Sequence, residues 1–244
     1  MSGPKRFFAE NISLGSVVEL SGDEFEHAKN VLRLSVGDEA VLLDNSGKEY
    51  TGIVTEVNKR SLFLHIVRED VCPREAETEI ALAFGYLKNA DKNEFIVQKA
   101  VELGVKKLVA FSSEFSSAYM NENKLERLNK VAKEAAKQCL RAVAPKVEYA
   151  EDFTRALSLL SGYENKLFAC EFAKTSEADI RKLSGSTALV VGSEGGFSQQ
   201  EAEQARQAGF AWVSLGKRIL RAETAAVALV SIVAFSLGEM ESGV

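Results

Sequence analysis

The sequence predicts an α/β protein in which a parallel sheet flanked by helices follows a small β-barrel. The first 72 residues alternate short β-prone runs with turn residues, whereas strands and helices alternate over residues 73–244. Apolar residues make up 46% of the chain and charged residues 27%, as in water-soluble globular proteins. A length of 244 residues exceeds one average domain and falls short of two, so a small module joined to a larger one fits.

Four β-prone runs and one helical stretch make up the predicted barrel. The runs cover residues 16–20, 39–43, 50–57 and 62–67. Asn45-Ser46-Gly47 supplies a turn between the second and third runs. A helical stretch over 23–34 places Phe25 and Leu32 on one apolar face. Pro73 and the charged residues after it are typical of a connector, so we place the boundary between the modules after residue 72.

The second module alternates strands and helices in a regular order. The predicted elements are strand 79–87, helix 92–103, strand 107–111, helix 124–141, strand 166–170, helix 177–183, strand 187–191, helix 199–208, strand 212–215 and a final helix from Ala222. Such alternation favours a parallel sheet with helices on both of its faces. Ser198 and Glu201 form a capping box for the helix at 199, and Gly209 is placed to end that helix.

The charge distribution leaves two interpretations open. A net charge of −5 is unusual for a nucleic-acid-binding protein. Residues 124–146, however, hold seven Lys or Arg against two Glu, and a helix there would align Arg127, Lys130, Lys137 and Arg141 along one side. This basic stripe either contacts RNA phosphates or is a solvated helix face.

The sequence argues against a metal site, a disulfide framework and a membrane-spanning segment. The three cysteines, Cys72, Cys139 and Cys170, are scattered singly, and the chain has only two histidines, so we expect neither a disulfide framework nor a metal site. His27 is expected to pack within the barrel. No apolar signal segment follows Met1, and the apolar run at 225–237 is too short to span a bilayer. We therefore expect a cytoplasmic protein.

Two glycine-bearing loops follow consecutive strands near the carboxyl terminus. The first is Gly192-Ser193-Glu194-Gly195-Gly196-Phe197, and the second runs from Leu215 to Thr224. Ligands bind at strand carboxyl ends in open α/β sheets, and glycine lets a backbone pass close to a ligand. The late position and the spacing exclude a dinucleotide fingerprint and a P-loop. For the first loop alone, a simple tight turn is an equally good interpretation.

These loops resemble two motifs of the ribosomal RNA small-subunit methyltransferase E family, G-P-E-G-G-F-S and L-G-x-R-I-L-R-x-E-T-A. The second motif is matched from Leu215 through Ala225. Four positions depart from the family pattern: Ser193 replaces Pro, Phe115 replaces Arg, and Cys139-Leu140 replace Ser-Gly. We expect these departures to affect RNA contacts more than cofactor binding.

The resemblance implies a PUA-like RNA-binding barrel over 1–72 and a SPOUT methyltransferase domain over 73–244, whose carboxyl-terminal loops form a trefoil knot. It also implies S-adenosylmethionine as cofactor, a homodimer in which the second subunit completes the site, and methylation of a uridine at N3 in small-subunit (16S) ribosomal RNA. The alternatives are a SPOUT enzyme that acts on another RNA, such as a transfer RNA, and a non-catalytic RNA-binding or ribosome-assembly factor.

The site residues follow from the loops and the resemblance together. The expected cofactor-binding residues are Gly192, Glu194, Gly195, Gly196, Leu215, Gly216, Ile219, Leu220, Arg221 and Thr224. Arg6, Arg33 and Lys88 join the basic stripe as expected RNA contacts. Arg221 is the first choice for a catalytic cation, because a guanidinium donates hydrogen bonds to a carbonyl oxygen and keeps its own proton. Glu194 or Glu223 either takes the uracil proton or caps a helix start.

Overall fold

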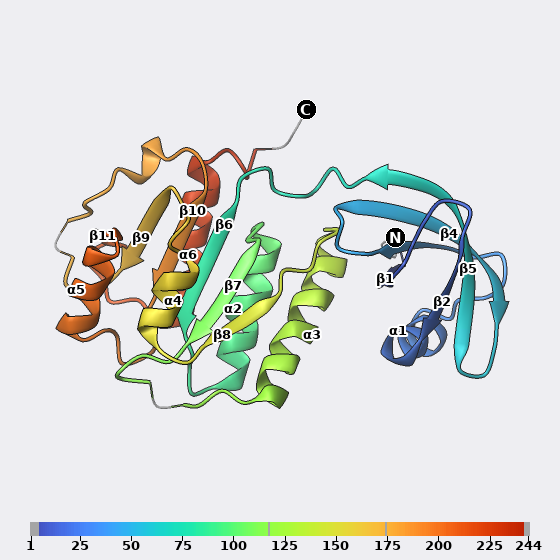
Figure 1. Cartoon of the computed structure of the whole chain (residues 1–244), viewed down its shortest axis with the longest axis horizontal. Helices are drawn as coiled ribbons and strands as arrows, with labels where there is room; N and C mark the ends of the chain where they lie inside the picture. Colours follow the sequence, from blue (N-terminus) through green and yellow to red (C-terminus); the bar gives the residue numbers. More distant parts are fainter. Residues whose placement is uncertain (1–4, 117, 174, 242–244) are drawn as a thin grey trace. The chain divides into compact units, whose positions relative to one another are not determined.

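The computed structural model describes residues 5–116, 118–173 and 175–241. They divide into two compact units, one within Met1–Glu75 and Ala136–Ala144 and the other within Ala76–Ala135 and Pro145–Val244 (Figure 1). The first unit therefore includes a short segment that lies far along the chain. The boundary that we placed after residue 72 from the sequence assigns this segment, Ala136–Ala144, to the second module.

The first unit is built on a curled sheet. Its strands are β1 (Arg6–Phe8), β2 (Val17–Ser21), β3 (Glu39–Leu43), β4 (Lys48–Val57) and β5 (Ser61–Val71), in the order β1-β3-β4-β5-β2. The four predicted strands are confirmed. β1 was not predicted, because three residues are too short to show a period; β1 pairs in parallel with β3, and the other pairs are antiparallel.

The helical stretch of the first unit closes its core. It forms α1 (Gly22–Glu26) followed by a π-helical turn, η1 (His27–Val31). Phe25 is buried in the core among Phe7, Leu42 and Leu64. The ring of His27 meets the ring of Phe7 edge-on, with centroids 5.9 Å apart, which confirms His27 as a packed residue.

The second unit contains the predicted parallel sheet. Its described strands are β6 (Ile80–Gly85), β7 (Lys107–Phe111), β8 (Val147–Ala150), β9 (Asn165–Ala169), β10 (Thr187–Val191) and β11 (Ala211–Val213), in the order β11-β9-β10-β6-β7-β8. Every pairing in this order is parallel. The central strands β6 and β10 are buried along their whole length, as expected for a sheet covered on both faces.

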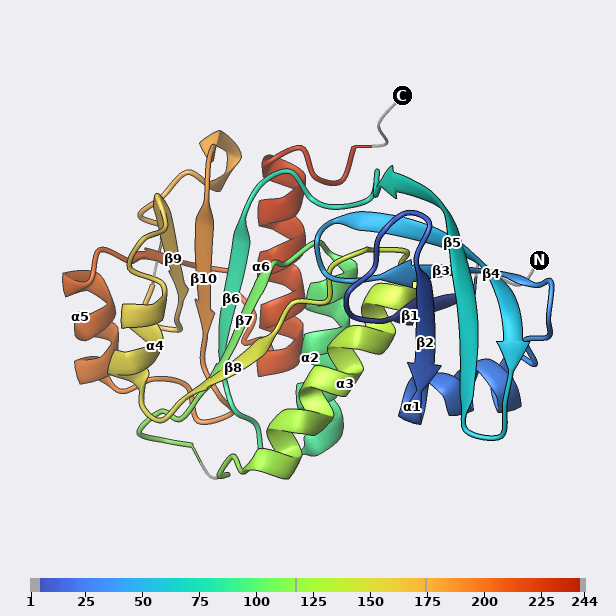
Figure 2. The same cartoon turned by 45° about the vertical axis from the view of Figure 1, so that its right-hand side comes forward.

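Helices cover both faces of this sheet, as predicted. They are α2 (Ala90–Glu102), α3 (Glu122–Gln138), α4 (Phe153–Leu159), α5 (Gln199–Gln207) and α6 (Ala222–Ser236). α2 and α6 pack together on one face, and α4 and α5 pack together on the other (Figure 2). The capping box of Ser198 and Glu201 is present at the start of α5, and Gly209 follows its end with a φ of +85°. Within the described ranges, no helix combines the length and apolar character needed to cross a membrane.

Two secondary-structure predictions for this unit need correction, and two elements were not predicted. The helix predicted at 177–183 is wrong, because the segment contains only a 3₁₀ turn, η2 (Ile180–Lys182). The Glu177 carboxylate binds the backbone N–H of Trp212 and the guanidinium of Arg206, so this residue is held beside β11 instead of starting a helix. β8 and α4 were missed. The basic helix ends at Gln138, three residues before its predicted end at Arg141.

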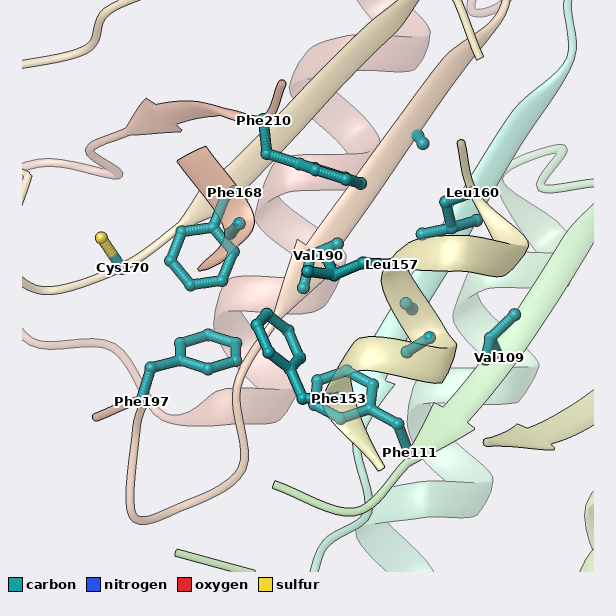
Figure 3. Packing of buried hydrophobic residues seen from close by; sticks show 14 of the residues in the cluster. Val109, Phe111, Phe153, Leu157, Leu160, Phe168, Cys170, Val190, Phe197 and Phe210 are labelled. Carbon is teal, nitrogen blue, oxygen red and sulfur yellow. The ribbon is translucent and has the colours of Figure 1, made fainter. Parts of the chain in front are cut away.

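An aromatic core lies between the sheet and the helices α4 and α5. Phe111, Phe153, Phe168, Phe197 and Phe210 are all buried there (Figure 3). The ring of Phe197 lies 4.4 Å from that of Phe168 and 5.3 Å from that of Phe153, measured between centroids. Because Phe197 directly follows Gly195-Gly196, this packing anchors the first glycine loop to the core.

Candidate active site

The two glycine loops line one cavity at the carboxyl ends of β9, β10 and β11. Its volume is about 700 Å³, within the range of ligand pockets. Residues 169–171 after β9, 191–197 after β10 and 213–222 after β11 form most of the wall. Parallel strands end at the same edge of a sheet, so loops that are distant in sequence meet there.

Most of the residues expected to bind a cofactor line this cavity. They are Gly192, Glu194, Gly195, Gly196, Leu215, Gly216, Ile219, Leu220 and Arg221. Thr224 and Glu223 lie in the first turn of α6 and are not part of the lining. Nine of the ten residues expected to bind the cofactor therefore line the cavity, and Thr224 does not.

The first loop is a tight turn as well as a part of the cavity wall. Gly196 N–H donates to the carbonyl oxygen of Ser193 over 3.0 Å. The Ser193 hydroxyl lies 3.4 Å from that of Ser113. A Cβ on Gly85, at the end of β6, would overlap the backbone nitrogen of Ser193, so the loop crosses directly over that strand end. The loop is therefore both a tight turn and a part of the cavity wall, so the two interpretations from the sequence are compatible.

The glycines of this loop accommodate protein neighbours. A Cβ on Gly195 would lie 2.6 Å from the Cβ of Phe115, and a Cβ on Gly192 would lie 2.9 Å from the ring of Phe197. Gly196 has a φ of +69°, and a Cβ there would overlap the carboxylate of Glu171. We expected glycine here to keep space for a ligand. The contacts show that larger side chains would displace neighbouring protein groups and so move the loop.

Charged groups of both signs line the cavity. The cations are Lys92, Lys217, Arg218 and Arg221, and the carboxylates are Glu171 and Glu194. Arg221 is exposed and stands at the N-cap of α6, with an extended backbone and no capping hydrogen bond from its side chain. Glu194 is exposed, and the N-cap of the following helix α5 is Ser198. The helix-capping role considered for Glu194 is therefore not seen.

Lys92 was missed by sequence reasoning. It lies in the first turn of α2, and its Nζ is 3.2 Å from Oε1 of Glu223. Glu223 Oε2 is buried and has no hydrogen-bond partner among the described residues. The signal that could have found Lys92 is its place at the start of a helix that follows the central strand β6, because that end of α2 lies at the same sheet edge as the loops.

Cys170 also lines the cavity. Burial raises the pKa of its thiol, so the thiol stays protonated at neutral pH and is a poor nucleophile. In the part of the chain that the structure describes, no group of three or more His, Cys, Asp or Glu residues is arranged to hold a metal ion.

Three of the expected RNA contacts are buried in ion pairs of the first unit. Arg6 binds Glu49 over 2.8 Å, Lys137 binds Glu24 over 3.3 Å, and Arg141 binds Glu75 over 3.1 Å. Only 2% of the surface of Arg141 is exposed. The prediction of one solvent-facing stripe from Arg127 to Arg141 is wrong, because carboxylates distant in sequence cover its carboxyl-terminal half.

The other expected RNA contacts are exposed. They are Arg33, Lys88, Arg127 and Lys130. Arg127 forms two hydrogen bonds of 2.9 Å with Glu94, and these bonds lower the pKa of the Glu94 carboxyl. On α3, exposed cations are thus confined to the part before Ala135: Lys124, Arg127, Lys130 and Lys133.

Both units match known domains of RNA methyltransferases. Residues 74–234 match the family model described as an RNA methyltransferase domain, and residues 20–67 match an RNA methyltransferase PUA domain. The ribosomal RNA small subunit methyltransferase E of Bacillus subtilis is 29% identical over 95% of this chain and 96% of its own length.

Several solved structures are similar over nearly the whole chain, and two of them contain S-adenosylmethionine. One is ribosomal RNA small subunit methyltransferase E from Neisseria gonorrhoeae, bound to S-adenosylmethionine. It is 33% identical with a TM-score of 0.88, and the match covers 96% of this chain and 98% of that one. A methyltransferase from Legionella pneumophila in complex with the same cofactor is 26% identical with a TM-score of 0.87, over 96% of this chain and 98% of that one. This chain belongs to the ribosomal RNA small subunit methyltransferase E family.

Proposed function

We propose that this chain transfers a methyl group from S-adenosylmethionine to N3 of a uridine in small-subunit ribosomal RNA. The observation that carries the proposal is the single cavity formed by both family motifs, the Gly192–Phe197 loop and the Leu215–Thr224 loop. A second support is that another member of the family has been solved with S-adenosylmethionine bound.

The residues of the cavity fit this cofactor. Val191, Val213, Leu215 and Leu220 provide apolar walls suited to an adenine ring. Backbone N–H groups of the glycine loops can bind the polar edges of the adenine and ribose. Charged side chains of both signs complement a ligand that carries a sulfonium, an amine and a carboxylate. The cofactor supplies the methyl group; the remaining chemistry belongs to the protein.

Methylation at N3 requires loss of the imide proton, after which negative charge spreads onto O2 and O4 of the uracil. Arg221 lines the cavity and is exposed, so its guanidinium can donate to one of these oxygens. Glu194, an exposed carboxylate of the same wall, is the better candidate to accept the proton. Glu223 is held by Lys92 outside the lining and acts in support of the structure.

Three further properties are proposed from the family resemblance: a homodimer, a trefoil knot of the carboxyl-terminal loops, and a cytoplasmic location, where ribosomal subunits are made. One observation supports the dimer. α6 is apolar nearly all round, yet Ile232 and Phe235 are exposed, and 71% of the Phe235 surface is accessible. A second subunit would cover these side chains.

The decisive experiment is mass spectrometry of ribosomal RNA from a strain that lacks the gene, with and without the returned wild-type gene. We expect N3-methyluridine in small-subunit RNA to disappear and to return. If a transfer RNA loses the modification instead, the substrate assignment is wrong. If no RNA changes and calorimetry detects no binding of S-adenosylmethionine, the chain is a non-catalytic factor.

A further inference from the structure

Lys92 brings a fixed positive charge into the cavity from outside the two glycine loops. It lies in the first turn of α2, and its ion-pair partner Glu223 lies in the first turn of α6. The two helices pack against each other. The side chain of Lys92 is 27% exposed and that of Glu223 15%, so the pair is largely shielded from water. Lys92 is therefore held more firmly than a lysine on a loop.

The ion pair leaves Lys92 able to bind a ligand. An ammonium group can donate three hydrogen bonds, and Oε1 of Glu223 accounts for at most one of them. Lys92 lines the cavity, whereas Glu223 does not. The carboxylate restrains the ammonium through the ion pair, and the ammonium has further N–H donors for a ligand in the cavity.

The other cations of the wall are placed differently. Lys217, Arg218 and Arg221 are exposed on the second loop. Charge interactions are weaker at exposed positions, because water and salt screen them. An anionic group inside the cavity would gain most from the shielded ammonium of Lys92.

We propose that Lys92 binds the carboxylate at the amino-acid end of S-adenosylmethionine and that Glu223 positions Lys92 for this contact. The inference rests on the proposed function, which supplies the cofactor. The carboxylate is the one anionic group of that molecule. Lys92 is then a cofactor-binding residue and Glu223 a positioning residue.

The test compares two ligands by calorimetry on the full chain without RNA. S-adenosylmethionine and its decarboxylated form share the adenine, ribose, sulfonium and amine, and differ by the carboxylate. The wild type should prefer the carboxylated ligand. Lys92→Met should bind it roughly 10- to 100-fold more weakly, the loss expected for a hydrogen bond between charged groups. The affinity of Lys92→Met for the decarboxylated ligand should change by less than about threefold.

Two further variants sharpen this result. Lys92→Arg keeps the charge and should retain most of the preference for the carboxylate. Lys217→Met is the matched control, because it removes a lysine from the same wall by the same substitution. It should retain the wild-type preference.

Lys92→Met leaves the Glu223 carboxylate without its ion-pair partner and could unfold the chain. Lys92→Met combined with Glu223→Gln removes both charges and should show the same selective loss. An equal loss for both ligands, or a preference abolished by Lys217→Met instead, overturns the inference. A wild type that binds neither ligand refutes the proposed function itself.

Discussion

Individual arginines of this chain have opposite roles that depend on their neighbours. Arg221 is exposed at the wall of the cavity, whereas Arg141 is buried against Glu75. A guanidinium satisfied by a carboxylate stabilises the fold, because burial of an unpaired charge is costly. A guanidinium without such a partner is available to substrate. Residue type alone does not distinguish the two.

Arg221→Ala should lower the methylation rate more than the affinity for the cofactor. The interaction strengthens as negative charge develops on the uracil, and loss of such a donor costs roughly 100- to 1,000-fold in rate. Single-turnover methylation of small-subunit RNA measures the rate, and calorimetry measures binding. Arg218→Ala, which changes an exposed arginine of the same wall, should have a much smaller effect. A rate for Arg221→Ala within threefold of the wild type would remove Arg221 from the mechanism.

Gly195→Val should weaken the binding of S-adenosylmethionine at least tenfold in a chain that remains folded by circular dichroism. The new side chain would collide with Phe115 and move the loop. Phe115→Gly in the same chain removes the closest of these contacts and should restore part of the affinity. If the double variant binds as poorly as Gly195→Val, the valine instead occupies the place of the ligand. Wild-type affinity in Gly195→Val would exclude this loop from the cofactor site.

At the scale of elements, α3 combines two kinds of surface along one helix. Leu128, Ala132 and Ala135 form a buried apolar side. Lys130 and Lys133 are exposed. Lys137, which lies two turns after Lys130 and one turn after Lys133, is buried and forms an ion pair with Glu24. The last residues of the helix belong to the first unit, which explains the change.

The exposed and buried lysines of α3 should respond differently to substitution. Each phosphate contact contributes roughly −0.7 to −0.9 to the slope of log K against log salt. Replacing Lys130 and Lys133 by Gln should therefore flatten the slope for RNA binding by about 1.5. The measurement is a salt titration with a small-subunit RNA fragment. An unchanged slope would identify this face of α3 as solvated surface.

Lys137→Gln is the matched control on the same helix. It should leave the salt slope unchanged and lower the free energy of unfolding, measured in urea. Removing one partner of a buried ion pair costs roughly 3 to 5 kcal/mol, and we expect the lower end because Glu24 is partly exposed. A flattened slope without a loss of stability would contradict the structural role of Lys137.

For the whole molecule, the open question is which surface a second subunit covers. Phe235→Glu should convert the proposed dimer into a monomer, because a charge would be buried among apolar side chains of α6. Light scattering after size-exclusion chromatography measures the mass. Val67→Glu, at an exposed position of β5 in the first unit, should remain a dimer. If Phe235→Glu keeps the mass of the wild type, α6 does not form the dimer interface.

Sequence patterns alone predicted the architecture of both units and the edge of the sheet at which the cavity lies. The alternation of strands and helices favours a parallel sheet, and the carboxyl ends of parallel strands share one edge. A parallel sheet therefore places the loops at Gly192 and Leu215 at the same edge. Such patterns arise between residues close in sequence and are visible without coordinates.

Only the tertiary structure decided which charged groups are satisfied and which face the cavity. Lys137 and Glu24 are 113 positions apart, and Arg141 and Glu75 are 66 apart. Lys92 reaches the cavity because α2 packs on α6, and the helix predicted at 177–183 is absent because Glu177 binds residues of α5 and β11. Burial and ion pairing depend on neighbours in space, and periodicity along the chain carries no information about those neighbours.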